Sequence, residues 1–469
     1  MAGAGTEHAR AHLWTAVVFG LATPLTFILC LTLWRTPFPL TEAVAIFENV
    51  TNTSTDLWVP ATSYYRPLFY LMVSAIWHNA GTLDAALAWL KLVQIVAVLL
   101  LVVLFILHLR PRTFLDAAAA SVAVAVLIGS PGFRDNLELP LSYTTVGMPL
   151  VLIVWILLNR QPRPGHAPLI VALTLIAIGF KEQGLVIVPV VVAAWWMRAP
   201  GATRGVAATL AAIAVAYVLF RLHWRAEWPV FEQAIGLGFT EIEVPEATAR
   251  FGAFPYFVYA YSGASTMASL LFAEPARGVF RIVEAWSQGR AQAWQFAHVG
   301  ASIGLTSVIA WWGVHSLRIK GGWSTESRAF VTLAVVLLAC GALSFNYSRD
   351  RLAGMAVVFY AVAAFFALRA AALRAVEASP GRFTAAALAV FVLAVAWQTR
   401  AIATIEYVRA TAWRNHMEWL VMLPERRVEF AERPAYLRIM DSMIEQGTDP
   451  AAPRPTRYPA WVALTIGQP

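Results

Sequence analysis

Long apolar runs alternate with short polar segments along the whole chain. The runs are about 17 to 25 residues long, enough for each to cross a hydrocarbon core of roughly 30 Å as a helix. Because they are apolar on every face, with no period of two, they favour helices over strands. The pattern therefore predicts an all-α polytopic membrane protein with about eleven transmembrane helices. The predicted spans lie near residues 13–35, 84–109, 114–130, 143–159, 167–180, 184–198, 204–222, 296–318, 328–345, 352–371 and 383–400.

Positive charge is concentrated in alternate loops between the predicted spans. The basic loops are HLRPR at 108–112, NRQPRPGH at 159–166, MRAPGATR at 197–204, LRIK at 317–320 and LRAAALRAVEASPGR at 368–382. Because Lys and Arg are enriched in cytoplasmic loops, we expect these five to face the cytoplasm. The two long loops, at about 36–83 and 223–295, and the tail at 401–469 would then face outward. We therefore predict a transmembrane domain over 1–400 and an outward-facing tail over 401–469.

Two stretches in the outward loops are apolar without being clear spans. RPLFYLMVSAIWHNA at 66–80 is too short to cross the bilayer, which favours a helix lying at the interface. The stretch at 251–273 is long enough to span, but its aromatic residues, glycines and hydroxyl side chains favour interfacial helices. Counting it as a span would also place the basic loop at 317–320 outside. Whether it crosses the membrane is left open by the sequence.

Composition agrees with a chain solvated by lipid. Hydrophobic residues make up 59% of the chain and charged residues 13%, and the mean hydropathy is +0.63. The net charge of +8 lies mainly in the short basic loops, so we read it as a topology signal and predict no nucleic-acid partner. Cys30 and Cys340 both fall in apolar runs, where a thiol behaves as a small hydrophobic group.

Ionisable residues at the outward ends of spans are the candidates for chemistry, because charge at membrane depth is costly. The candidates are Glu42, Glu48, Asp56, Arg66, Arg134, Asp135, Glu138, Lys181, Glu182, Arg349, Asp350 and Arg351. In such a cluster a carboxylate could act as a general base or hold a divalent ion, while Arg and Lys could bind a phosphate leaving group. For any single residue, the alternative is an ordinary interfacial anchor.

Three segments in the first half of the chain follow an order that resembles a known family. TEAVAIFEN and SYYRPLFYLMVSAIW come after the first span, SPGFRDNLE follows the third, and FKEQGLVIVPVVV begins the sixth. In these features the chain resembles the polytopic glycosyltransferases that use polyprenyl-phosphate sugars. These form the GT-C superfamily, which includes the protein O-mannosyltransferases and their bacterial relatives. The resemblance covers roughly residues 36–200, and YSRDRLAG further on is similar to a basic, phosphate-facing segment of these enzymes.

The resemblance implies an inverting glycosyltransferase that moves a sugar from a polyprenyl-phosphate carrier to a glycan, lipid or protein acceptor. It places Glu42 as the catalytic acid, with Asp135 supporting it through a metal or a hydrogen bond to the acceptor. The residues it suggests for the donor phosphate are Arg66, Lys181, Arg349 and Arg351. The acids expected in supporting roles are Glu48, Glu138 and Glu182. A divalent cation, Mg or Mn, is a candidate cofactor that Glu42 and Asp135 could hold.

Several points stay open at this stage. Many relatives carry two adjacent acids where this chain has Thr41 and Glu42 with its next acid at Glu48, so the identity of the base is not settled. We expect a bacterial inner (plasma) membrane location with the active site facing the periplasm. One alternative is a ligase or polymerase of the O-antigen type, acting on a pyrophosphate-linked oligosaccharide. Another is a lipid or sugar transporter, although the repeat symmetry common in transporters is not visible.

Overall fold

The computed structural model describes most of the chain in helices. It describes residues 2–37, 44, 66–138, 143–224, 234–237, 240–252, 256–272, 280–318, 322–345, 348–377, 380–429 and 431–447. Within these ranges the only strands are β1 (Ala234–Leu237) and β2 (Thr240–Glu243), which form a two-stranded antiparallel sheet with Ala234 opposite Glu243.

The long helices fall on the predicted apolar runs, and several short helices lie outside them. In chain order they are α1 (Ala2–Arg35), α3 (Pro67–Ala80), α4 (Leu83–Leu109), α5 (Phe114–Gly129), α6 (Pro131–Glu138), α7 (Tyr143–Leu158), α8 (His166–Phe180), η1 (Glu182–Val186), α9 (Ile187–Trp196), α10 (Arg204–Trp224), α12 (Val244–Phe251), α13 (Tyr256–Phe272), α14 (Phe280–Ser287), α15 (Ala293–Arg318), α16 (Thr325–Leu343), η2 (Asp350–Ala353), α17 (Gly354–Glu377), α18 (Pro380–Glu429) and α19 (Pro434–Gly447).

Among the described residues, six helical stretches are long and apolar enough to cross a membrane. They are His12–Arg35, Leu83–Leu109, Gln295–Arg318, Thr325–Leu343, Asp350–Glu377 and Phe383–Glu418. A seventh candidate is α5 with α6, a pair bent by 51° at Ser130. Shorter apolar helices occupy Thr145–Leu158, His166–Phe180, Glu182–Trp196 and Arg204–Phe220. The prediction of an all-α polytopic membrane protein is therefore confirmed, whereas the number of eleven spans stays a prediction.

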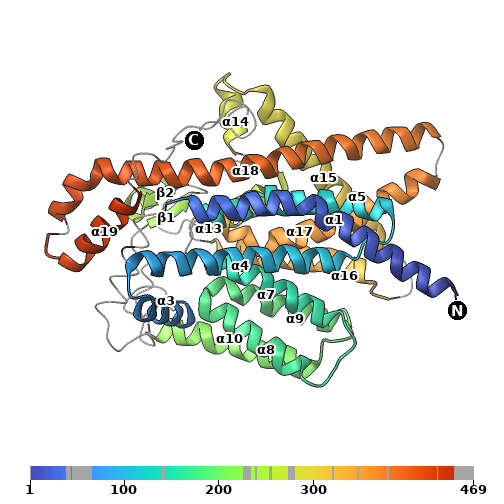
Figure 1. Cartoon of the computed structure of the whole chain (residues 1–469), viewed down its shortest axis with the longest axis horizontal. Coiled ribbons are helices and arrows are strands. Elements are labelled where there is room, and N and C mark those ends of the chain that lie inside the picture. The colour runs from blue at the N-terminus through green and yellow to red at the C-terminus, as the bar shows by residue number, and fades with distance from the viewer. Residues whose placement is uncertain are drawn as a thin grey trace.

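The longest helices run along the long axis of the molecule (Figure 1). α3, the small sheet and α19 lie at the left of the view, and the N-terminus lies at the right. α4 and α7 end toward the right, where the basic loops join the helices.

The centre of the bundle is α17, which packs against α5, α16, α15 and α18. Its residues from Gly354 to Phe365 are all buried. Many of them are alanine, and α5 is similarly rich in small residues. Small side chains let helix backbones approach closely where lipid offers no hydrophobic driving force. At Gly129 an added Cβ would lie 3.1 Å from the backbone nitrogen of Ala401 on α18.

Three predicted boundaries differ from the structure or stay open. The predicted span at 114–130 ends at Gly129, because the backbone of Ser130 is extended, and helix α6 then begins at Pro131 at an angle of 51° to α5. The predicted division at 400 lies inside α18, which continues without a break to Glu429; the division into two domains stays a prediction. The ambiguous stretch at 251–273 contains α13, which packs against α15 and α16, and is not one of the candidate spans. α3 matches the short helix predicted at 66–80.

Candidate functional site

The first part of the site is the contact between α6 and η2. α6 begins just after Ser130, whose backbone oxygen accepts hydrogen bonds from the amides of Phe133 and Arg134 at 3.1 Å each. Gly132 faces η2 closely, since an added Cβ there would lie 2.9 Å from the backbone oxygen of Asp350. A glycine at this position therefore permits the two segments to touch, and it brings PGFRDNLE against SRDRLAG.

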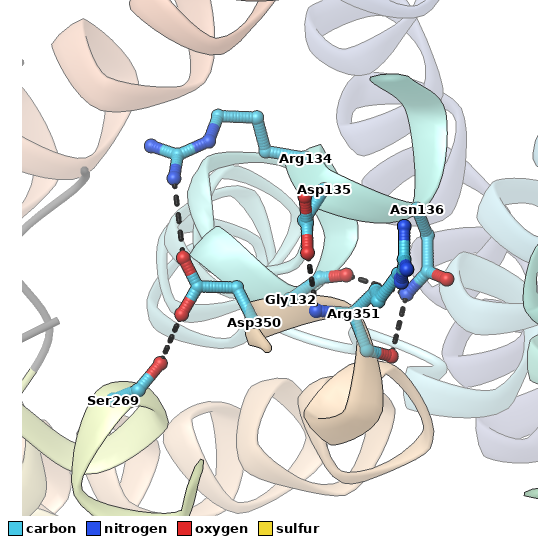
Figure 2. A network of polar contacts seen from close by, with 7 residues as sticks. All are labelled: Gly132, Arg134, Asp135, Asn136, Ser269, Asp350 and Arg351. Carbon is cyan, nitrogen blue, oxygen red and sulfur yellow. Dashed lines mark hydrogen bonds and ion pairs between the residues drawn. The ribbon is translucent and has the colours of Figure 1, made fainter. Parts of the chain in front are cut away.

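A buried ion pair joins these two segments (Figure 2). Arg134 Nη2 lies 3.4 Å from Asp350 Oδ2, and their side chains are only 4% and 7% exposed. The hydroxyl of Ser269 on α13 donates to the other carboxylate oxygen of Asp350. The guanidinium of Arg134 also stacks on the ring of Tyr407 in α18, at 4.2 Å from the ring centroid. Buried charges are retained when paired and hydrogen-bonded in this way, so the pair is a structural clamp between α6, η2, α13 and α18.

Beside this clamp, Asp135 fixes the backbone of Arg351. The carboxylate oxygen Oδ2 of Asp135 accepts a hydrogen bond of 2.8 Å from the Arg351 amide. The Nδ2 of Asn136 donates to the backbone oxygen of Arg351 at 3.1 Å, and to that of Gly132 at 2.6 Å. Both backbone groups of Arg351 are thus held from α6, as Figure 2 shows. Asp135, Arg349 and Arg351 are all only partly buried, so the segment presents charged groups near the surface of the site.

A second ion pair lies between the start of α3 and the turn after α8. Arg66 Nη2 lies 3.0 Å from Glu182 Oε1, and Arg66 Nε donates to Oε2 at 3.2 Å. This is the two-point geometry in which a guanidinium binds a carboxylate most strongly. Burial raises the pKa of Glu182, but the charge and hydrogen bonds of Arg66 outweigh it and bring that pKa to about 2. Glu182, in the turn between the two predicted spans, is therefore ionised at neutral pH.

The turn that carries Glu182 is tight for a local reason. Gly184 lies directly against the backbone of Ala177 and Ile178, so no side chain would fit there. The amide of Gly184 donates to the backbone oxygen of Lys181 at 2.8 Å. Lys181 itself is buried, with 8% of its surface exposed. The helix α16 contacts both η1 and η2, so it connects the turn that carries Glu182 with the segment that carries Arg351.

The structure therefore unites some of the predicted site residues and does not describe others. It joins Asp135 to Arg351 and Arg66 to Glu182, and it places Lys181 and Arg349 next to these pairs in the chain. Glu42 and Glu48 lie outside the described residues, and Glu138 is described only as the last residue of α6. The roles expected for all of these residues stay predictions.

Two residues that hydrogen-bond to η2, Ser269 and Asn136, could not be predicted from the sequence as members of the site. Ser269 lies in the stretch at 251–273 that could not be assigned, and Asn136 is a neutral residue beside the charged pair Arg134 and Asp135. The available signal was the repeated Arg-Asp dipeptide, at Arg134-Asp135 and again at Arg349-Asp350. Each dipeptide contributes one residue to the buried ion pair.

The predicted divalent cation has few ligands in the part of the chain that the structure describes. No group of three or more His, Cys, Asp or Glu side chains there could hold a metal. Asp135 is the single described candidate, and one of its oxygens already accepts the Arg351 amide. A hard cation of the Mg type is usually held by one or two carboxylates and substrate phosphates. Glu42, the other acid expected to hold the ion, lies outside the described residues, so the metal stays a prediction and no chemical step below depends on it.

The chain was compared with family models, curated protein sequences and solved structures. No family model matches the chain, and no curated protein sequence matches it. Among solved structures, the chain is similar to the crystal structure of ArnT from Cupriavidus metallidurans bound to undecaprenyl phosphate, with 13% sequence identity and a TM-score of 0.44, over 97% of this chain and 76% of that one.

Proposed function

We propose that this chain is a membrane glycosyltransferase that moves a sugar from a polyprenyl-phosphate carrier to an acceptor hydroxyl at the outer end of the helix bundle. The observation that supports it most is the hydrogen bond from the Arg351 amide to Asp135. It connects the segment that holds Asp135, which the family resemblance places in support of the catalytic acid, with the segment it assigns to the donor phosphate, although the two residues lie 216 positions apart in the sequence.

In this proposal the segment from Arg349 to Arg351 binds the phosphate of the donor. The carboxylate of Asp350 pairs with Arg134 and accepts from Ser269. The cations left for the phosphate are its chain neighbours, Arg349 and Arg351. Arginine binds phosphate through several N–H groups in a fixed plane, and it stays charged throughout the reaction. The phosphate gains charge when its bond to the sugar breaks, so these cations favour the leaving group most strongly in the transition state.

The reaction needs a base for the acceptor, and Glu42 is the residue proposed for it. The base takes the hydroxyl proton while the acceptor oxygen attacks the anomeric carbon. The bond from that carbon to the phosphate oxygen breaks, and the electron pair leaves with the polyprenyl phosphate. A single displacement of this kind inverts the configuration of the sugar. Glu48 is the alternative base, since it is the next acid in the chain.

The Arg66–Glu182 pair receives a different role from the one expected from the sequence. Because Glu182 occupies two nitrogens of Arg66, we assign this pair to holding the start of α3 against the turn after α8. Lys181, next to Glu182, remains the proposed donor-phosphate ligand on that side. The acceptor, the sugar and the periplasmic orientation belong to this proposal as well.

The test is release of polyprenyl phosphate by the purified full-length chain from a panel of synthetic polyprenyl-phosphate monosaccharides, with membrane extract as the acceptor source. We expect release with at least one sugar, and its loss by a factor of about a hundred or more in Glu42→Gln. Arg351→Ala should lose donor affinity. The control Arg318→Ala, which changes the last residue of α15, should keep it. Release of polyprenyl pyrophosphate from a pyrophosphate-linked oligosaccharide instead would overturn the donor class. Full turnover by folded Glu42→Gln would overturn the base.

A further inference from the structure

A second candidate binding site lies far from the first one. A pocket of about 350 Å³ opens between the last turns of α4 and α7, beside the start of α16. Its walls are apolar, formed by Leu104 and Leu107 of α4 and by Ile153 and Ile156 of α7. Its polar lining includes His108, Asn159, Arg110 and Arg160, and none of these takes part in the site at the outer end.

The pocket lies at the basic end of the bundle. α7 begins near the outer site, directly after the segment that follows α6, and runs for 16 residues. At 1.5 Å per residue this places its end about 24 Å from its beginning. The two loops that frame the pocket, HLRPR and NRQPRPGH, are among those predicted to face the cytoplasm. The pocket is therefore expected at the cytoplasmic edge of the hydrocarbon core.

The positive charge in this pocket is not neutralised by the protein. Within the described ranges no carboxylate pairs with Arg110 or Arg160, and both side chains are exposed. The acid beside Thr325 at the rim, Glu326, lies 3.8 Å from Arg369 instead. Two cations that share one pocket without an acid are complementary to an anion.

The backbone and the buried polar atoms are also unusual here. Arg110 has a φ of 46°, the left-handed conformation, although it is not glycine and precedes a proline. In the described part of the chain, Nε2 of His108 and Oδ1 of Asn159 are buried without a hydrogen-bond partner. Strained backbone and unsatisfied polar groups are uncommon in native structures and concentrate at ligand sites.

We propose that this pocket binds an anionic phospholipid of the cytoplasmic leaflet, with the lipid phosphate between Arg110 and Arg160 and an acyl chain along Leu107 and Ile153. The combination of an apolar wall with unpaired arginines at the membrane edge selects this ligand, because a free phosphate would leave the apolar wall without a partner. A zwitterionic lipid would bring a second, positive group toward the same arginines. Basic pockets between transmembrane helices on the cytoplasmic side are suited to anionic head groups.

The experiment measures lipid binding to the full chain in detergent by native mass spectrometry, with phosphatidylglycerol and phosphatidylcholine as probes. The wild-type chain should retain phosphatidylglycerol in preference to phosphatidylcholine. The double variant Arg110→Gln/Arg160→Gln should lose about thirtyfold in apparent affinity for phosphatidylglycerol, as expected for two cations near a membrane surface. Both arginines are exposed, so the variant should remain folded.

The matched control is Arg112→Gln/Arg163→Gln. These arginines lie in the same two loops and are exposed, but they do not line the pocket. The control removes the same charge, and it should keep the phosphatidylglycerol affinity of the wild type. Equal losses in the two double variants would show general attraction to basic loops and overturn the site. Equal binding of both lipids by the wild type, or thermal stabilisation by inorganic phosphate as large as that by phosphatidylglycerol, would also overturn it. Neither result depends on the proposed transferase activity.

Discussion

Arg134 and Asp350 form a buried ion pair, 3.4 Å between Nη2 and Oδ2, that links α6 to η2 across 216 positions of sequence. The carboxylate also accepts from Ser269, and the guanidinium stacks on Tyr407. Four separate segments thus meet at one pair of charges. Because the neighbours of this pair in the chain are Asp135 and Arg349, the geometry of the proposed phosphate site depends on it.

Breaking the pair should destabilise the chain more than removing it. In Arg134→Met the carboxylate of Asp350 stays buried without its cation, and a loss of about 3 to 5 kcal/mol in the free energy of unfolding is expected. In Arg134→Met/Asp350→Leu no buried charge remains, so part of the loss should be recovered. Thermal unfolding in detergent measures both variants. Additive losses in the double variant would mean that the two side chains are not energetically coupled.

The sequence was sufficient for the long helices but not for this network. Apolar runs repeat with lengths suited to a bilayer, so the long helices could be placed from hydropathy, whereas short helices such as α6, α12, α14 and α19 could not. The helix α3 matches the short helix expected at 66–80. The partner of a charged residue is set by tertiary packing, which hydropathy does not encode. Arg134 and Arg349 both sit beside an aspartate in the chain, but only the structure reveals that Arg134 pairs with the aspartate of the other dipeptide.

The same limit applies to the bends and to the role of Arg66. The apolar run at 114–130 gave no sign that a second helix, α6, begins directly after Ser130 at an angle of 51° to α5. Hydropathy carries no information about the direction of the backbone. The family resemblance suggested that Arg66 holds the donor phosphate. Its two hydrogen bonds to Glu182 arise from the packing of α3 against α8, which joins residues 116 positions apart.

The Arg66–Glu182 pair should make stability depend on acid pH. The pKa of Glu182 falls from 4.5 to about 2 because Arg66 favours the ionised form more than burial disfavours it. A lowered carboxyl pKa contributes stability that is complete above the ordinary value and is lost as pH falls toward the folded value. The thermal stability of the wild type should therefore exceed that of Glu182→Gln at pH 6, and the difference should shrink between about pH 4.5 and 2.

Arg66→Gln provides the control for this pH effect. Without the guanidinium, the cost of burying the ionised Glu182 carboxylate is no longer offset. The thermal stability of Arg66→Gln relative to the wild type should therefore rise as the pH falls. A difference between wild type and Glu182→Gln that stays constant from pH 6 to 3 would contradict the pairing. The comparison uses the same detergent and salt throughout, since salt weakens exposed ion pairs.

Gly132→Ala should separate α6 from η2. The new Cβ would lie 2.9 Å from the backbone oxygen of Asp350 and 3.0 Å from Cγ2 of Val357, so one element must shift. Overpacking of this kind typically costs about 1 to 3 kcal/mol. Gly300→Ala in α15 is the matched control, because nothing lies within 4 Å of its added Cβ. Equal thermal stability of the two alanine variants would contradict the close contact.

The role of Asp135 separates two explanations of the site. As a base or metal ligand, Asp135 needs its negative charge, so Asp135→Asn and Asp135→Ala should both lose most activity. As a positioning residue, it needs an oxygen that accepts the Arg351 amide. Asparagine retains such an oxygen and alanine does not. The structure favours the second role, so we expect Asp135→Asn to keep most of its turnover and Asp135→Ala to lose it.

The effect of Asp135→Ala should appear mainly in donor binding. The lost hydrogen bond to a charged acceptor contributes about 1.5 to 3 kcal/mol, and it holds the backbone of the residue proposed to bind the donor phosphate. The affinity for polyprenyl phosphate should therefore fall in Asp135→Ala while Asp135→Asn stays near wild type, which titration with the lipid in detergent measures. Asn136→Ala should have a similar effect, since Asn136 holds the carbonyl of the same residue. If Asp135→Asn instead binds the lipid normally but fails to turn over, the charge itself is needed and Asp135 belongs with Glu42 in the chemical step.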